Sequence, residues 1–161
     1  VNGEFAERFE GRNLDLICIP QPEPLLIRAD SRRIWRVLEN LYVNVCKYAM
    51  PGTRVYVDAI KKDGKIQFSI KNISENPLNF QADELTERFI RGDVSRSTEG
   101  SGLGLSIAKN LTVLQHGSFN IYLDGDLFKV TITFDEAVKE KKPMPPMIVP
   151  EVVQEEAQQD A

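Results

Sequence analysis

The feature that most constrains this chain is the glycine-rich run EGSGLGLSIAK at residues 99–109. Gly100, Gly102 and Gly104 stand at alternate positions and lead directly into a segment with helical apolar spacing. Glycine lets the backbone approach a ligand closely, and the first turn of a helix offers free N–H donors and a positive dipole end. The run therefore predicts a site for an anion such as phosphate, although a plain strand-to-helix connection can use the same residues.

Length and charge narrow the class of protein further. A chain of 161 residues allows one sizeable domain, and its net charge of −4 argues against a general nucleic-acid or membrane binder. No apolar run is long enough to span a membrane, and no secretory signal opens the sequence. Cys18 and Cys46 lack the spacing of a metal site or a disulfide framework, so we expect small buried side chains in a reducing compartment.

Composition and periodicity divide the chain into three parts. Residues 1–13 are interpreted as a linker, residues 14–138 as the folded domain, and the Pro-rich, acidic residues 139–161 as a disordered tail. Alternating apolar and polar residues predict strands at 14–19, 25–28, 54–60 and 65–71, and a last hairpin in residues 119–134 that turns at Asp124-Gly125. Helical spacing predicts helices at 34–49, 83–89 and 103–116, the first capped by Asp30, with a charged loop at 90–100.

A polar stripe follows one side of the predicted helix 34–49. Asn40, Asn44, Lys47 and Tyr48 have the spacing i, i+4, i+7 and i+8, which places them on neighbouring turns. A solvated helix face would explain any single asparagine. Two amides four residues apart, followed by a cation, also suit a hard metal ion bound next to a phosphate.

Three motifs in series resemble a known family. The stretch LENLYVNVCKY (38–48) is similar to the N box of the catalytic ATP-binding domain of sensor histidine kinases, in the superfamily that includes gyrase, Hsp90 and MutL. The run ERFIRGD (87–93) resembles the F box, and residues 100–105 resemble the second glycine box, in the same order. The resemblance covers roughly residues 14–134. It implies an α+β fold of the Bergerat type: an α/β sandwich with a mixed, mostly antiparallel sheet, helices on one face and an ATP lid.

The resemblance also implies roles for individual residues. Asn44 would bind Mg²⁺, Lys47 would bind the phosphates of ATP, and Tyr48 would lie beside the nucleotide. Asn40 stands where gyrase-type relatives carry a glutamate that activates water, and an uncharged residue there suits transfer to a protein side chain better than hydrolysis. Asn40 and Lys47 are therefore the candidate catalytic residues. The remaining candidate contacts to ATP are Arg91, Arg96, Gly100, Ser101, Gly102, Leu103, Gly104 and Leu105.

The first glycine box departs from the family pattern Asp-x-Gly-x-Gly. Asn72 stands in the position of the aspartate and still offers a carbonyl oxygen to the adenine amino group, while Ser74 and Asn76 replace both glycines. Asn72 is also the next residue in phase with the apolar side of the strand at 65–71. Because a neutral acceptor is weaker than a charged one, we expect adenine recognition to be weakened about tenfold and retained.

The function implied by the resemblance is transfer of the γ-phosphoryl group of ATP to a histidine on a separate dimerisation domain, which would precede the linker. A response regulator would be a further partner, and the parent protein would be a membrane-anchored homodimer with this domain in the cytoplasm. His116 lies at a predicted helix end before Gly117, where we expect a structural role. Two alternatives stay open: a catalytically silent interaction module with the same fold, and a serine kinase of the anti-sigma-factor type.

Overall fold

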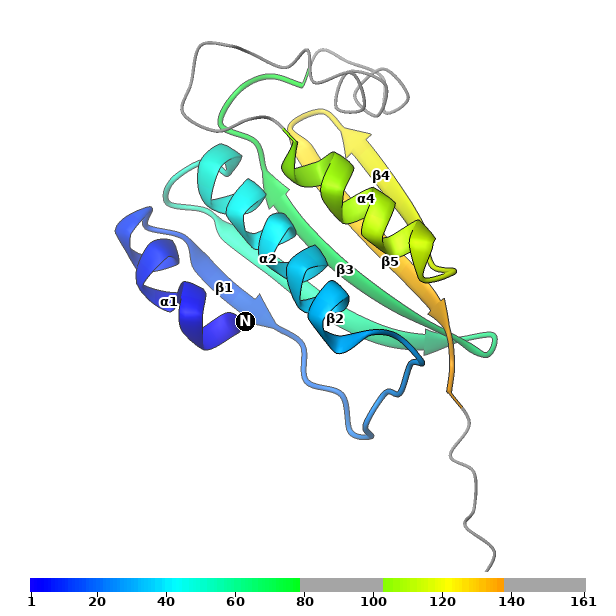
Figure 1. The fold of residues 1–161 in the computed structure, drawn as a ribbon. Helices are drawn as coiled ribbons and strands as arrows, with labels where there is room; N and C mark the ends of the chain where they lie inside the picture. The colour runs from blue at the N-terminus through cyan, green and yellow to red at the C-terminus, as the bar shows by residue number, and fades with distance from the viewer. Residues whose placement is uncertain (79–102, 138–161) are drawn as a thin grey trace, which may run out of the picture.

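The computed structural model describes residues 1–78 and 103–137. In this part of the chain the helices are α1 (Asn2–Gly11), α2 (Ser31–Tyr48) and α4 (Gly104–Leu114), and the strands are β1 (Asp15–Cys18), β2 (Arg54–Lys62), β3 (Lys65–Ile73), β4 (Ser118–Asp124) and β5 (Leu127–Asp135). The strands form one sheet in the order β1-β2-β3-β5-β4. β1 pairs with β2 in parallel and the other pairs are antiparallel. The helices cover one face of this sheet (Figure 1), so the predicted α+β fold is confirmed.

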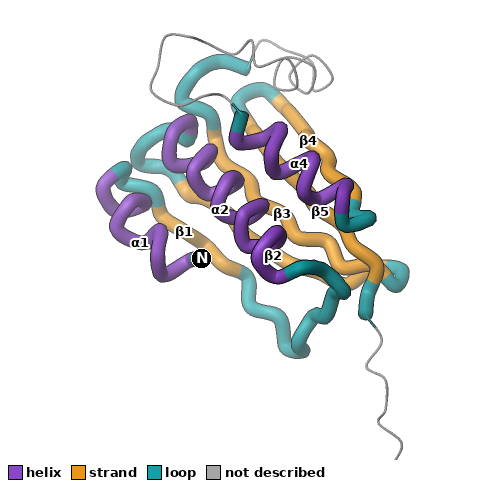
Figure 2. The backbone as a smooth tube through the Cα atoms, viewed as in Figure 1, coloured by secondary structure: helices purple, strands orange, loops and turns teal. Residues whose placement is uncertain are grey.

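The helices lie over one face of the sheet (Figure 2), and the buried apolar side chains of the core come from both layers. α2 buries Val37, Leu41 and Val45, which follow one another at helical spacing. On the sheet, burial alternates along β5, where Phe128, Val130, Ile132 and Phe134 face the helices. The helical spacing of α2 and the alternation along β5 are both visible in the sequence, which is why these elements were predicted.

The start of α2 is fixed by a side-chain cap, as predicted. The carboxylate of Asp30 accepts a hydrogen bond of 3.0 Å from the backbone N–H of Arg33. This bond is the main reason why the pKa of Asp30 lies below its ordinary value. At the other end, Ala49 has an extended backbone and Pro51 follows, so the helix stops at Tyr48.

The N-terminal segment differs from the prediction. Residues 1–13 were expected to be a linker, but α1 packs on the domain and buries Phe5 and Phe9. The two rings lie 5.4 and 5.8 Å from the ring of Tyr42 on α2, in edge-on geometry. Their spacing of four residues was the signal for a helix with one apolar stripe. α1 therefore belongs to the core of the domain.

The predicted strand at 25–28 is not formed. Only Ile27 makes an isolated bridge, to Glu136, and the Ala137 N–H donates to the Leu26 carbonyl oxygen at 2.8 Å. β5 ends at Asp135, so this segment has almost no neighbouring strand with which to pair. Alternation of apolar residues over four positions does not show whether a partner strand is present, so the prediction of a strand was wrong here.

The first of the two hairpin turns is as predicted and the second differs by one residue. Asp63 and Gly64 both take positive φ, as a two-residue turn of type I′ requires. In the second hairpin Asp124 still pairs with Leu127, so the turn residues are Gly125 and Asp126. The predicted elements at 83–89 and 90–100 and the predicted tail at 139–161 lie outside the described residues.

The cysteines also differ from the expectation of two small buried side chains. Cys18 is exposed at the end of the edge strand β1, where its sulfur accepts a hydrogen bond of 3.1 Å from the Asn2 side chain. Cys46 on α2 is half-buried, and this burial raises the pKa of its thiol. Of the helices described, none has the length and apolar character needed to cross a membrane.

Candidate functional site

Three elements meet at one end of the helical layer. The C-terminal end of α2, the C-terminal end of β3 and the N-terminal end of α4 lie at the same edge of the fold (Figure 1). Backbone hydrogen bonds join the first two: the Glu75 N–H donates to the Tyr48 carbonyl oxygen at 2.8 Å, and the Met50 N–H donates to the Ile73 carbonyl oxygen at 2.8 Å. The sequence-predicted site residues that the structure describes come from these elements.

Asn72 is the most informative of them. Its side chain lies on the helix-facing side of β3 and is only 3% exposed. The amide nitrogen donates to the carbonyl oxygen of Ile73 at 3.1 Å, whereas Oδ1 is buried with no hydrogen-bond partner among the described residues. A buried acceptor left unpaired costs about 1–3 kcal/mol. The site thus holds a buried carbonyl oxygen that can accept a hydrogen bond, for example from the amino group of a ligand.

Gly104 brings the start of α4 against α2. A Cβ atom on this residue would lie 3.3 Å from Oδ1 of Asn40, which is closer than such atoms ordinarily approach. Asn40 is held in turn, because its amide nitrogen donates to the Arg36 carbonyl oxygen at 2.7 Å. The residue before the helix, Leu103, provides no side-chain cap. The first-turn N–H groups of α4 are therefore not capped by that side chain, which suits an anion such as phosphate.

The polar stripe on α2 is present in the structure. Asn40, Asn44 and Tyr48 are half-buried, and Lys47 is exposed. In the described residues no three His, Cys, Asp or Glu side chains gather as a metal site. A metal ion at this stripe would instead take an amide oxygen from Asn44 and further oxygens from a bound ligand, and such oxygen donors suit Mg²⁺.

The remaining candidate residues divide between the described and the other parts of the chain. Leu103 is 40% exposed and Leu105 is 2% exposed, so Leu105 contributes to the core. Five further candidates lie outside the described residues: Arg91, Arg96, Gly100, Ser101 and Gly102.

Sequence reasoning missed one contact at this edge. Arg12, just after α1, reaches Glu75 in the segment that resembles the first glycine box, and their side chains form an ion pair at 2.8 Å. The only sequence signal was a charged residue between the two positions where the family carries glycine. Its partner, 63 residues away, could not be identified without the fold.

The fold and this edge define an ATP-binding domain built as a helix-covered sheet. The chain belongs to the family of histidine kinase-, DNA gyrase B-, and HSP90-like ATPases, whose model matches residues 29–138. The predicted family is thus confirmed.

The relatives that the chain resembles include a histidine-protein kinase and a heme sensor protein. It is 30% identical over 119 residues to the signal transduction histidine-protein kinase BaeS of Escherichia coli K12, covering 73% of this chain and 25% of BaeS. It is 28% identical over 121 residues to the heme sensor protein HssS of Staphylococcus epidermidis, covering 73% of this chain and 26% of HssS. The chain thus spans about a quarter of the length of these relatives.

Solved structures share the fold. The catalytic domain of the histidine kinase ThkA superposes with a TM-score of 0.71 at 23% identity, covering 84% of this chain and 87% of that domain. The mycobacterial sensor histidine kinase MprB gives a TM-score of 0.68 at 22% identity, covering 84% and 92% of the two chains. The architecture is that of a histidine kinase catalytic domain.

Proposed function

We propose that this domain binds ATP together with Mg²⁺ and transfers the γ-phosphoryl group to a histidine on a separate domain. The observation that carries the proposal is the buried Oδ1 of Asn72, which has no hydrogen-bond partner in residues 1–78 and 103–137 and lies at the edge where α4 begins. A nucleotide would suit both Asn72 and the start of α4, because adenine brings a hydrogen-bond donor for Oδ1 and phosphate brings negative charge to the helix N-terminus. Membership of the ATPase family and similarity to sensor kinases support this reading.

Each residue of the edge would have a definite task. Asn72 accepts a hydrogen bond from the adenine amino group, and Tyr48 lies beside the nucleotide. The N–H groups at the start of α4 and the ammonium of Lys47 hold the phosphates. Asn44 would hold Mg²⁺, which neutralises charge on the phosphates when it is bound. Arg91, Arg96, Gly100, Ser101 and Gly102 are proposed to complete the phosphate contacts.

The proposed reaction needs positioning and neutralisation of charge, and no covalent intermediate on this chain. Asn40 carries no charge at the position from which gyrase-type relatives would activate water, so transfer to a side chain is favoured over hydrolysis. His116 is a poor acceptor, because α4 has 11 residues and rises about 16 Å between the site and its other end. We therefore place the acceptor histidine on a dimerisation domain of a homodimeric, membrane-anchored parent, with a response regulator as the next partner.

One observation favours a second candidate, a silent interaction module. Both glycines of the first glycine box are absent, and Ser74 in the first of these positions is 6% exposed and tied by a bridge to Ala49. A pocket in which both glycines are replaced would no longer bind a nucleotide under this alternative. A serine kinase of the anti-sigma-factor type would use the same pocket and would differ only in its acceptor.

Binding of a non-hydrolysable ATP analogue with and without Mg²⁺ tests the proposal. We expect Mg²⁺-dependent binding by the unaltered chain and a loss of at least about tenfold in Asn44→Ala, because the amide oxygen is the proposed metal ligand. Glu39→Gln is the matched control, since Glu39 lies exposed on the same helix and should not alter binding. Unchanged binding by Asn44→Ala would contradict the metal assignment, and no binding by the unaltered chain would favour the silent module.

Phosphotransfer is tested with labelled ATP and the upstream segment of the parent protein. We expect acid-labile, histidine-linked label on that segment and none on the isolated chain. His116→Gln should behave like the unaltered chain. Acid-stable label on a serine would instead support the serine kinase, and label on the isolated chain that disappears in His116→Gln would place the acceptor here.

A further inference from the structure

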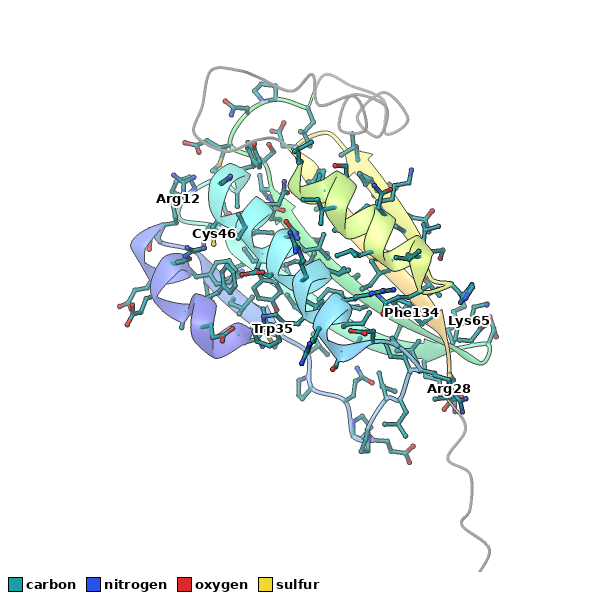
Figure 3. All side chains as sticks on the ribbon, in the orientation of Figure 1. Arg12, Arg28, Trp35, Cys46, Lys65 and Phe134 are labelled. Carbon is teal, nitrogen blue, oxygen red and sulfur yellow. The ribbon has the colours of Figure 1, made fainter. Side chains whose placement is uncertain are left out.

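Arg12 connects the end of α1 to the segment that follows β3 through side-chain hydrogen bonds. Its Nη2 donates to Oε2 of Glu75 at 2.8 Å and to the backbone carbonyl oxygen of Ala49 at 3.0 Å. One guanidinium thus holds two pieces of chain that meet at the candidate nucleotide site: the residue after α2 and the residue three positions beyond Asn72. Figure 3 shows Arg12 at the end of α1, on the side that faces α2.

The segment that Arg12 reaches is residues 73–76, which stand in the place of the first glycine box. Backbone bonds hold it to the chain at the end of α2 and to the turn between β4 and β5. The Met50 N–H donates to the Ile73 carbonyl oxygen and the Glu75 N–H to that of Tyr48, both at 2.8 Å, and the Ser74 N–H donates to Asp126 at 2.7 Å. In the described part of the chain, Arg12 is the one side chain from another element that bonds to this segment. The carbonyl oxygen of Ile73 in the segment also orients the side chain of Asn72. The position of Ile73 in this segment therefore influences the direction in which Oδ1 of Asn72 points.

The ion pair between Arg12 and Glu75 contributes little to the stability of the domain. The side chains of Arg12 and Glu75 are 35% and 45% exposed, and pairs this exposed contribute about 0–1 kcal/mol. Nε of Arg12 is buried without a hydrogen-bond partner among the described residues, which costs free energy. The ion pair with Glu75 therefore offers little net stability, and its effect on the position of the segment is the more informative property.

We propose that Arg12 is a positioning residue for adenine recognition, which acts through Glu75 and the segment 73–76 on the acceptor oxygen of Asn72. This inference rests on the proposed function, because it requires that Asn72 binds adenine. It adds a connection that the family motifs do not contain, since it links α1 to the nucleotide site. Because coupling between two sites is reciprocal, bound ATP should in turn strengthen the contact between Arg12 and Glu75.

The test separates adenine recognition from phosphate binding. Dissociation constants for ATP and for inorganic triphosphate, both with Mg²⁺, are measured on the full chain and on Arg12→Gln, Glu75→Gln and Arg12→Lys. We expect a rise of about fivefold in the dissociation constant for ATP in the two Gln variants, with that for triphosphate unchanged. Arg12→Lys keeps the charge and should recover part of the affinity. Lys61→Gln removes an ion pair of similar length, to Glu136, and is the matched control.

The charge exchange Arg12→Glu with Glu75→Arg gives a second check. If the pair itself positions the segment, the double variant binds ATP more tightly than either single variant. Equal losses of ATP and triphosphate affinity would show general damage and overturn the inference, as would ATP binding in Arg12→Gln equal to that of the unaltered chain. In either case the proposed function stands, because the unaltered chain binds ATP. An unaltered chain that binds no ATP overturns both.

Discussion

The backbone of Gly117 lies directly against the ring of Phe134. A Cβ atom on Gly117 would lie 2.6 Å from Cε1 of that ring and 2.9 Å from Cγ2 of Thr112. Phe134 is 5% exposed and Thr112 is completely buried, so neither side chain can move aside into solvent. Glycine is required here by close packing between the end of α4 and β5.

Gly117→Ala should therefore destabilise the domain. Forcing a methyl group into a packed core costs about 1–3 kcal/mol, and the free energy of unfolding in urea should fall by this amount. Gly3→Ala is the control, because Gly3 lies in α1 and has no atom within 4 Å of a Cβ placed there. That substitution should leave stability unchanged or raise it. Equal stability of the two variants would mean that the core relaxes around the new methyl group.

His116→Gly should stabilise the same helix end. His116 has φ of 64°, its N–H donates to Val113 at 2.9 Å, and the Gly117 N–H donates to Thr112 at 3.0 Å, which is the hydrogen-bond pattern of a Schellman motif. Glycine adopts this left-handed conformation without the steric cost that a Cβ brings. Because relief of about 1–2 kcal/mol of left-handed strain exceeds the entropy that glycine adds to the unfolded chain, we expect a gain of up to about 1 kcal/mol in the free energy of unfolding, measured by urea denaturation. A loss would show that the imidazole makes a favourable contact that outweighs the strain.

Tyr42 should make the stability of the domain decrease at alkaline pH. Burial raises the pKa of its hydroxyl from 10.0 to about 12, and the hydroxyl donates to the Asn2 side chain. Because the folded-state pKa is raised, the contribution is fully present below pH 10 and is lost as the pH rises towards 12. The free energy of unfolding should thus fall with pH more steeply in the unaltered chain than in Tyr42→Phe. Parallel curves for the two proteins would contradict this.

Local pattern was sufficient for much of the fold. The Asp30 cap, the apolar stripe of α2 and the alternation along β3 and β5 each depend on residues near one another in sequence, and these elements were predicted close to their observed bounds. The isolated Ile27 bridge was mistaken for a strand because pairing depends on a neighbour that sequence does not show. α1 was missed although Phe5 and Phe9 carried a helical signal, because the segment was interpreted by its position before the motifs.

The site was predictable in its residues and not in its contacts. The phase of β3 indicated that Asn72 would face the core, and it does so at 3% exposure. That Oδ1 finds no partner within the described part of the chain depends on the residues packed around it, which the sequence does not show. The contact between Gly104 and Asn40 joins positions 64 residues apart (104 − 40), and the motif gave no reason to expect it. Motifs identify chemistry, whereas distances between motifs come from the tertiary fold.

Asn72→Asp is the sharpest test of the adenine pocket. The substitution removes the donor to the Ile73 carbonyl oxygen and places a carboxylate in a buried position, so the chain without nucleotide should lose about 1–3 kcal/mol of stability. A charged acceptor makes a stronger hydrogen bond with the adenine amino group than a neutral one. ATP affinity should therefore be equal or higher, by up to about tenfold, even though the free chain is less stable.

The two effects are measured on the same variant by urea denaturation without nucleotide and by titration with the ATP analogue in Mg²⁺. Asn72→Ala is the companion variant, because it removes the acceptor and should weaken ATP binding while leaving inorganic triphosphate binding unchanged. Greater thermal stabilisation by ATP in Asn72→Asp than in the unaltered chain would follow from tighter binding to a less stable fold. A clear loss of ATP affinity in Asn72→Asp would show that residues 73–76 present the acceptor in a geometry suited only to an amide, and that the family's aspartate cannot be restored without its glycines.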